Sequence, residues 1–331
     1  MAIYGQTSTK MLKIEINPEG DLPVQATTMN ENELLIEEIL KLKKESGALV
    51  LAHYYQRLEI QKCADFVGDS FELAKRAKEA ESNLIVFCGV RFMGESAKIL
   101  NPTKKVLMPR PDAGCQMADM VTASKLRELK SQYPRAAVVC YVNSSAETKA
   151  ESDICCTSSN AVRVCESLDT NEIIFVPDKN LGAYVAGKVP DKMFHLYYGY
   201  CPVHRNLTRD EAIKAKKQHP QARLFVHPEC EKEVIDLADY VGSTSGIIRE
   251  AETSTAEEFI IGTEYGVVER LAEYNPGKKF YLLSPKLVCI NMKFTSLINL
   301  RDCLRDQIGE IDMPEELRLK AFTPLDRMMK I

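Results

Sequence analysis

The feature of this chain that most restricts its fold is a unit of roughly 87 residues that occurs three times. In each copy an apolar run ends in a polar side chain, and an aspartate follows 12 positions later. The pairs are His53 and Asp65, Tyr141 and Asp153, and His227 and Asp239. A serine or threonine lies five positions after each aspartate, at Ser70, Ser158 and Thr244, and a cysteine lies 48 or 50 positions after it, at Cys115, Cys201 and Cys289.

The apolar runs alternate with stretches of helical periodicity, which is the pattern of βαβ units with parallel sheets. The sequence therefore predicts an α/β fold of three similar αβα domains, related by a pseudo-threefold axis around a central site. The predicted boundaries are an N-terminal extension over 1–31, repeats over 32–121, 122–207 and 208–293, and C-terminal helices over 294–331 that pack back on the first repeat.

Composition narrows the function classes. The 331 residues are 45% hydrophobic and 27% charged, with a net charge of −4, so we expect no nucleic acid partner, which would need a basic face. No apolar run is long enough for a membrane span, and the first residues lack the apolar core of a signal peptide. We therefore expect no membrane partner and a cytoplasmic location.

In parallel α/β units the carboxyl ends of the strands form the ligand side. Side chains two residues apart on a strand face the same way, so this side is expected to carry six polar groups. They are His53, Tyr55, Tyr141, Asn143, His227 and Glu229. A histidine at a strand end is also common as a structural residue, and the pattern by itself leaves that alternative open.

The turns after each aspartate resemble helix starts. Helix N-termini with serine or threonine hydroxyls bind anions, so the turns at Ser70, Ser158 and Ser243–Thr244 predict a pocket for a ligand with three anionic groups. Ordinary helix capping would produce the same residues, and both interpretations stand at this point.

The chain has 11 cysteines but no CxxC pair, so a zinc ribbon or a thioredoxin-like site is unsupported. Cys115, Cys201 and Cys289, one per unit, could converge on the axis and hold a metal or an iron–sulfur cluster with one open coordination position. Equivalent packing positions in three cores would explain the same spacing, and the residues leave the choice of metal open.

Several stretches between about residue 33 and residue 295 resemble the quinolinate synthase family, the NadA-type enzymes of NAD biosynthesis. They are AHYYQ, ADFVGDS, FMGESAKILNP, YVNSSAETKAESDICCTSSNA, PDKNLGAYV, GYCPVH, VHPEC, ADYVGSTSG, IIGTEYGV and VCINMK. The resemblance implies three αβα domains around a central active site and one four-iron, four-sulfur cluster. Motif matching assigns the cluster to Cys115, Cys201 and Cys289, which leaves the fourth iron open to substrate as a Lewis acid.

The resemblance also implies a reaction and the roles of the site residues. Members of the family are condensing transferases that join iminoaspartate, supplied by an aspartate-oxidising enzyme, to dihydroxyacetone phosphate, and release phosphate and two waters. Glu229 resembles the catalytic base and Tyr55 a proton-transfer partner; His53 and His204 orient substrate, and Tyr141 and Asn143 line and gate the pocket. The phosphate is expected near Ser243 and Thr244 with His227 assisting, and the carboxylates near Ser70 and Ser158.

Two departures from the family pattern stand out. Tyr54 occupies a position where relatives often have asparagine, and Cys289 is followed by Ile290, Asn291 and Met292 rather than by the CxxCxxC of some members. A homodimer is compatible with the resemblance. An iron–sulfur sensor or electron carrier would be an alternative, but no DNA-binding output module is recognisable. A metal-free sugar-phosphate-binding protein is another, and it predicts a colourless protein.

Overall fold

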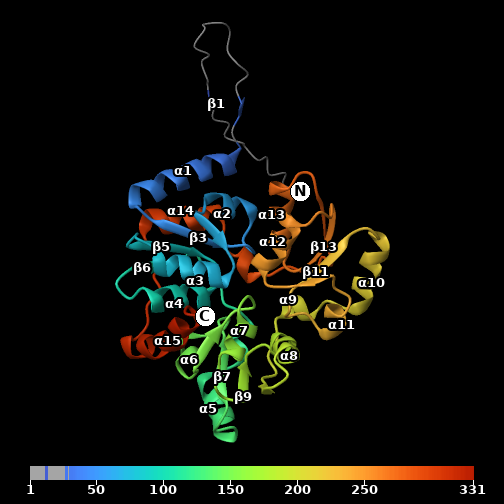
Figure 1. Ribbon diagram of the computed structural model, residues 1–331. Helices are drawn as coiled ribbons and strands as arrows, with labels where there is room; N and C mark the ends of the chain where they lie inside the picture. The colour runs from blue at the N-terminus through green and yellow to red at the C-terminus, as the bar shows by residue number, and fades with distance from the viewer. Residues whose placement is uncertain (1–11, 14–26, 29) are drawn as a thin grey trace, which may run out of the picture.

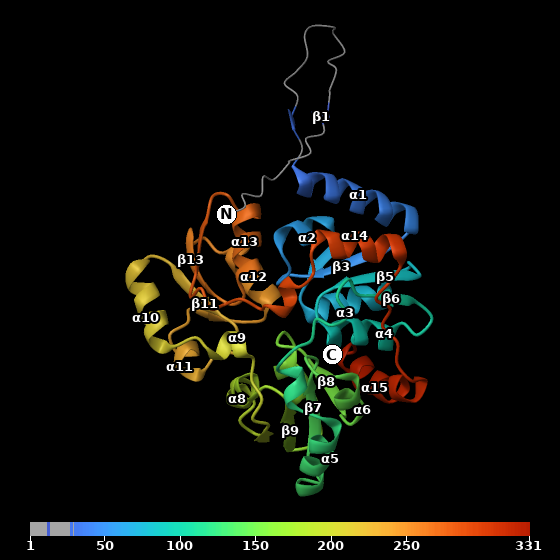
Figure 2. The ribbon, with the colours of Figure 1, turned by 180° about the vertical axis from the view of Figure 1, so that it is seen from behind.

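The structure is a computed structural model that describes residues 12–13, 27–28 and 30–331, so most of the predicted N-terminal extension lies outside the described residues. Three lobes surround a common centre, one for each repeat (Figure 1, and from behind in Figure 2). Each lobe has a four-stranded, all-parallel sheet, and the strand order is the same in all three. The predicted fold class, three similar αβα domains, is confirmed. A short antiparallel pair, β1 (Leu12–Lys13) and β2 (Thr27–Thr28), precedes them.

The first unit has the sheet order β4-β3-β5-β6. Its elements are α1 (Glu31–Ser46), β3 (Leu49–His53), α2 (Leu58–Cys63), β4 (Phe66–Gly68), α3 (Ser70–Glu79), β5 (Leu84–Cys88), α4 (Arg91–Leu100), β6 (Lys105–Leu107) and the 3-10 turn η1 (Ala118–Met120). Helix α1 begins at a capping box formed by Asn30 and Glu33, and it ends at Gly47, whose φ of 62° is the left-handed conformation that glycine adopts without strain.

The second unit repeats this order as β8-β7-β9-β10, and the third as β12-β11-β13-β14. The second contains α5 (Ala123–Gln132), β7 (Ala137–Tyr141), α6 (Ala146–Ala150), β8 (Ile154–Cys156), α7 (Ala161–Glu166), β9 (Glu172–Val176), α8 (Lys179–Lys188), β10 (Met193–Leu196) and α9 (Pro202–Arg205). The third contains α10 (Arg209–Gln218), β11 (Arg223–Val226), α11 (Lys232–Ile235), β12 (Tyr240–Val241), α12 (Thr244–Thr253), β13 (Glu258–Gly262), α13 (Tyr265–Tyr274), β14 (Lys279–Leu282) and the 3-10 turn η2 (Asn291–Lys293).

Helices cover both faces of the sheets, which explains why the strands are continuous apolar runs. On β3, the side chain of Leu51 packs into the cluster that includes α3 and α4. Its neighbours Val50 and Ala52 pack on the other face, with residues of α1, α2 and α14 (Leu297–Asp306). The sheets thus bury both faces and leave their carboxyl ends free to meet at the centre.

The three repeated aspartates perform the same structural task. In each unit the aspartate carboxylate accepts a hydrogen bond from a backbone N–H in the first strand, and its own backbone N–H donates to the carbonyl of the same residue. Asp65 pairs in this way with Val50, Asp153 with Val138 and Asp239 with Leu224, at carboxylate distances of 2.7–2.8 Å. The spacing that identified the repeat therefore reflects how each sheet fixes the chain beside its first strand.

Replacing Asp153 by alanine is expected to lower the free energy of unfolding by about 1–3 kcal/mol, because the amide of Val138 then loses its partner beside the buried strand. Urea unfolding followed by circular dichroism measures the change. Asp169→Ala, at an exposed position of the same unit, is the control and should stay within about 0.5 kcal/mol of the parent. Equal stability of the two variants would contradict a structural role for the repeated aspartate.

The two C-terminal helices pack differently. Helix α14 packs against α1, whereas α15 (Glu315–Met328) lies mainly against α6 and β8 of the second unit and also contacts α4 (Figure 1). Two arginines of α15 hold this position: Arg318 donates to the carbonyl of Ile99, and Arg327 donates to that of Asp153. This helix thus joins the first and second units.

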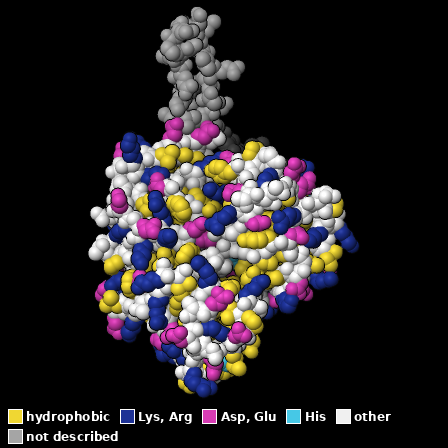
Figure 3. All heavy atoms as spheres, viewed as in Figure 1, with side chains coloured by type: hydrophobic (Ala, Val, Ile, Leu, Met, Phe, Trp, Pro, Cys, Tyr) yellow, Lys and Arg dark blue, Asp and Glu magenta, His cyan; other side chains and the backbone are white. Residues whose placement is uncertain are grey.

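The surface carries both charges. On the face in Figure 3, basic and acidic side chains are intermixed without a large area of either sign. In the described part of the chain, no helix combines the length and the apolar composition needed to cross a membrane.

Candidate active site

The three lobes enclose a cavity of about 320 Å³ where the strand ends meet. Twelve of the fourteen residues predicted for the site line it: His53, Tyr55, Ser70, Cys115, Tyr141, Asn143, Ser158, Cys201, His227, Glu229, Thr244 and Cys289. His204 and Ser243 lie just behind the wall, where both are buried. Val90, Phe92, Met117 and Met292 give one part of the wall an apolar character.

The histidines at the ends of β3 and β11 are held in the same way. The backbone N–H two residues on donates to Nδ1, from Tyr55 to His53 at 3.1 Å and from Glu229 to His227 at 3.3 Å. Nδ1 is therefore an acceptor, and in the neutral ring the proton sits on Nε2. Burial is the main reason that the pKa of each histidine falls to about 3, so both are neutral at pH 7 and offer an Nε2–H donor. Nε2 of His227 lies 3.2 Å from the hydroxyl oxygen of Ser158.

Glu229 is the centre of the polar network. Its carboxylate is buried and accepts hydrogen bonds from the hydroxyl of Tyr141 at 2.7 Å and from Nδ1 of His204 at 2.7 Å. Burial opposes its ionisation, but the interactions with His227, His204 and Tyr141 outweigh burial and hold the pKa of Glu229 below its usual value. The carboxylate is therefore ionised at neutral pH, in the form that can accept a proton.

A chain of hydrogen bonds connects Tyr55 to Glu229. The Tyr55 hydroxyl lies 2.8 Å from Oγ1 of Thr263, which lies 2.9 Å from Nε2 of His204. In the neutral tautomer whose Nδ1 donates to the carboxylate, Nε2 of His204 accepts from Thr263, and Thr263 in turn accepts from Tyr55. The hydroxyl of Thr244 donates to Tyr55 at 3.0 Å. With this tautomer every donor in the chain points toward Glu229, which provides a route for proton transfer from Tyr55 to the carboxylate.

Sequence reasoning did not identify Thr263, which is fully buried and does not line the cavity. The sequence position of Thr263 could have indicated it, because the residue directly follows β13 and polar site residues were expected at strand ends. Its partners are Tyr55 of the first unit and His204 of α9, and no local pattern indicates these contacts.

The serine turns differ from the expected caps. Helix α3 is capped by Asp69, whose carboxylate accepts from the N–H groups of Phe71 and Glu72, and the short helix α7 is preceded by Asn160. Only α12 has its predicted cap, Ser243, with Thr244 as its first residue. The negative charge of Asp69 already occupies the N-terminus of α3, so an anion at Ser70 would meet repulsion there. The turn at Thr244 is the better anion site.

Asn143 presents an unused acceptor. Its Oδ1 is buried and has no hydrogen-bond partner among the described residues, although the side chain lines the cavity. Buried polar atoms without partners are rare in folded proteins. The atom is therefore available to a ligand.

Three cysteines are set apart from the rest. Cys115, Cys201 and Cys289 are partly exposed and line the cavity, while the remaining cysteines are buried. Each precedes a short helical turn, η1, α9 or η2, whose backbone N–H groups face the sulfur. Burial nevertheless raises the pKa of Cys115 to about 12 and that of Cys289 to about 11, and it raises the pKa of Cys201 too. Thiolates are soft metal ligands, and with these raised pKa values the three thiols need a nearby cation in order to ionise. They therefore fit the role of ligands to an iron–sulfur cluster.

Two buried carboxylates position two of these cysteines. The carboxylate of Asp178 accepts a hydrogen bond from the backbone N–H of Cys201 at 2.9 Å and also caps α8. The carboxylate of Glu264 accepts one from the backbone N–H of Cys289 at 3.2 Å and also caps α13. Glu264 is also paired with the buried Lys293 at 3.0 Å. Sequence reasoning missed both carboxylates, although they occupy equivalent places after β9 and β13.

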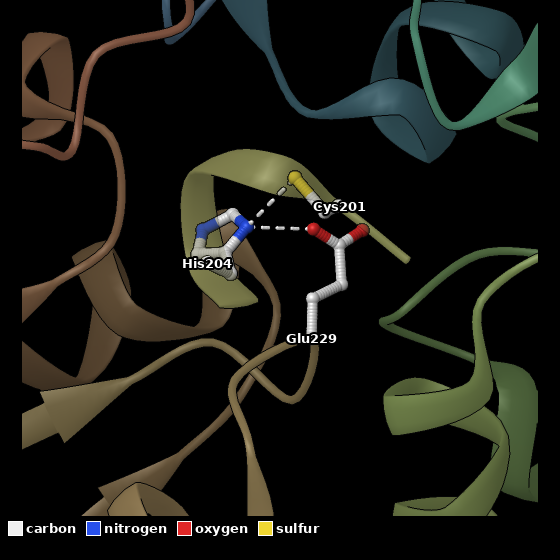
Figure 4. A group of neighbouring side chains, drawn as sticks. All are labelled: Cys201, His204 and Glu229. Atoms are coloured by element: carbon white, nitrogen blue, oxygen red, sulfur yellow. Dashed lines mark hydrogen bonds and ion pairs between the residues drawn. The ribbon is translucent and has the colours of Figure 1, made fainter. Parts of the chain in front are cut away.

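Cys201, His204 and Glu229 bring a sulfur, a nitrogen and an oxygen within 4.8 Å of one another, as Figure 4 shows. Such a group could hold a metal ion. Here His204 bonds directly to the carboxylate and lies 3.3 Å from the sulfur of Cys201, so hydrogen bonding alone explains the arrangement.

Comparison with known proteins identifies the family of the chain. A sequence model described as NadA, quinolinate synthetase A protein, matches residues 37–330. The chain is 53% identical over 303 residues to a quinolinate synthase of Alkaliphilus metalliredigens, which covers 92% of this chain and 100% of that protein. It is 52% identical over 301 residues to quinolinate synthase 2 of Methanosarcina acetivorans, with 91% and 97% covered. The chain therefore belongs to the quinolinate synthetase A family.

Proposed function

We propose that this protein is a quinolinate synthase of NAD biosynthesis, which condenses iminoaspartate with dihydroxyacetone phosphate and releases phosphate and two waters. The observation that carries the proposal is the cavity itself. Three accessible cysteines, one from each unit, face the same space as an ionised carboxylate and two neutral histidines. A simple sugar-phosphate-binding protein would need no such set of thiols.

Cys115, Cys201 and Cys289 would hold a four-iron, four-sulfur cluster through their sulfurs. When bound, the cluster would supply an iron without a cysteine ligand, a Lewis acid toward a hydroxyl or carboxylate oxygen. Asp178 and Glu264 would keep two of the cysteine backbones in place.

The cavity residues would bind the substrates through donors that do not depend on pH near neutrality. The Nε2–H groups of His53 and His227 and the start of α12 at Thr244 would meet anionic oxygens. The apolar wall around Phe92 would exclude water from the reacting carbons. Asn143 would accept from a substrate hydroxyl or imine N–H through its unpaired oxygen.

Glu229 would act as the base. Its bonds from Tyr141 and His204 keep it ionised but also weaken its basicity, so a donor that turned toward the substrate would strengthen the base when it is needed. Tyr55 and Glu229 would act at opposite ends of one hydrogen-bond chain. A proton that Glu229 passes on to the substrate could be replaced along the chain from Tyr55, which would then take up a proton from the substrate at its own end. Isomerisation, imine formation and two dehydrations need this kind of exchange.

An assay of the anaerobically reconstituted protein tests the proposal. Quinolinate should form from iminoaspartate and dihydroxyacetone phosphate, with one phosphate released per quinolinate. Bound iron without any product would favour an electron carrier, and a colourless, metal-free protein that still binds triose phosphate would favour a sugar-phosphate-binding protein. Either outcome would remove the proposed activity.

Two threonine variants separate binding from proton transfer. Thr244→Val is expected to raise KM for dihydroxyacetone phosphate by roughly ten-fold, because a hydroxyl beside the phosphate is lost. Thr263→Val should lower kcat by on the order of ten-fold or more with little change in KM, because it breaks the chain behind the wall. Thr263→Ser, which keeps the hydroxyl, should restore kcat. An unchanged KM in Thr244→Val would argue against the phosphate position.

A further inference from the structure

Two cysteines outside the cavity lie side by side on neighbouring strands, where a disulfide could join them. Cys140 on β7 and Cys155 on β8 are direct partners in the parallel register. Neighbouring strands lie about 4.7–4.9 Å apart, within the Cα separations that disulfides span. Partners in register point to the same face of the sheet, whereas Cys156, the next residue along β8, points to the opposite face. The side chains of Cys140 and Cys155 are therefore close together, whereas those of Cys155 and Cys156, which are adjacent in sequence, lie on opposite faces of the sheet.

A buried lysine lies beside this pair. Lys149 is fully buried, and its ammonium group donates to the carbonyl of Ser144 and lies 5.5 Å from the centre of the Phe92 ring. Within the described part of the chain, no carboxylate comes within ion-pair distance of it. A buried ammonium group without an anion is costly, so a nearby group that can become negative is favoured to do so. The Cys140 thiol is such a group.

The two thiols respond differently to this environment. Burial opposes ionisation of Cys140, but the Cys155 thiol, the charge of Lys149 and the hydroxyls of Ser144 and Ser152 lower its pKa to about 7. Burial raises the pKa of Cys155. A thiolate beside a protonated thiol is the arrangement of a nucleophilic and a resolving cysteine.

We propose that Cys140 and Cys155 form a redox site that a small peroxide converts to a disulfide across β7 and β8. The Cys140 thiolate attacks one oxygen of the peroxide, the O–O bond breaks, and a sulfenic acid forms while the second oxygen leaves and is protonated. The sulfur of Cys155 then attacks the sulfur of Cys140, loses its proton, and releases the sulfenic oxygen as water. With hydrogen peroxide, two thiols are oxidised and two waters form. The bond would tie together the strands that lead to Tyr141 and Thr157 in the cavity wall.

Peptide mapping tests the proposal on the full, anaerobically purified protein. The probe is diamide, which oxidises thiol pairs without generating radicals at iron; remaining thiols are blocked with iodoacetamide after denaturation. Trypsin cleaves after Arg135, Lys149 and Arg163, so Cys140 and Cys155 fall on different peptides, 136–149 and 150–163. A linked pair of these peptides that dithiothreitol separates is the expected product.

The neighbouring cysteine provides the matched control. Cys155→Ser should reduce the linked product at least ten-fold, and Cys156→Ser should leave it unchanged. Lys149→Gln removes the tryptic site between the two cysteines, so its product is detected as a disulfide within peptide 136–163. That disulfide should form roughly ten-fold more slowly at pH 7, because loss of the lysine charge raises the pKa of Cys140. Absence of the linked peptides from the oxidised parent, or their persistence in Cys155→Ser, would overturn the proposal. The outcome does not depend on whether the protein forms quinolinate, since neither thiol lines the cavity.

Discussion

Glu229→Gln is expected to lower kcat for quinolinate formation by about 100-fold or more, which is the range for loss of a general base. Glutamine retains the size of the side chain and can still accept from Tyr141 and His204, so the cavity should keep its shape. It cannot take up a proton. Product formation should fall while KM values stay within a few-fold of the parent, because the residue acts on the reacting atoms more than on binding.

Glu231→Gln is the matched control for this change. Glu231 lies two residues away, but it is only partly buried and pairs with Lys179 at 3.2 Å and Arg205 at 3.5 Å. Such an ion pair contributes little, so kcat should stay within about two-fold of the parent. Nearly full activity in Glu229→Gln would show that the base is elsewhere. Iron content should be measured in both variants, so that loss of the cluster is not mistaken for loss of the base.

Cys201→Ser is expected to remove most of the iron. An anaerobically reconstituted parent should bind about four irons per chain and show the brown absorbance of a cluster, and the variant should retain less than about one. A serine hydroxyl is a hard, weakly acidic ligand, and the desolvation that raises the pKa of the Cys201 thiol makes ionisation of a hydroxyl at this position still less favourable. Iron and sulfide analysis with an electronic spectrum measures the effect without any activity assay.

Cys156→Ser is the control, because Cys156 is fully buried in the core of the second unit and does not line the cavity. It should keep the full iron content even if its thermal stability falls. Equal iron loss in both variants would mean that cysteine replacement destabilises the whole protein. Full iron content in Cys201→Ser would exclude this cysteine as a ligand.

The prediction of three αβα units was correct because the repeated residues make contacts with residues close to them in the sequence. The bond from Asp65 to Val50 spans 15 residues, and the same bond recurs from Asp153 to Val138 and from Asp239 to Leu224. The cysteines fall into the cavity for a related reason, since each comes after the fourth strand of its unit and before a short helical turn. Short-range constraints of this kind leave a regular spacing in the sequence.

Other parts of the site depend on contacts that no spacing encodes. Thr263 connects Tyr55 with His204 across 208 and 59 positions of the chain. The helix caps were misassigned at α3 and α7. Asp69 caps α3, because aspartate is as good at capping as serine, and Asn160 occupies the cap position of α7 without a side-chain cap hydrogen bond. The placement of α15 against the second unit likewise depends on which apolar face was left uncovered.

The sequence alone was enough to establish the fold class, the number of units and twelve of the residues in the cavity wall, because strand periodicity and strand ends follow local rules. The tertiary structure determined the rest. The assembly of the units builds the hydrogen-bond chain from Tyr55 through Thr263 and His204 to Glu229. The register of β7 and β8 within the second unit pairs Cys140 with Cys155 rather than Cys155 with Cys156. Proton positions and thiol reactivity depend on distances of a few ångströms between segments far apart in the chain, and on the burial that those segments create for one another.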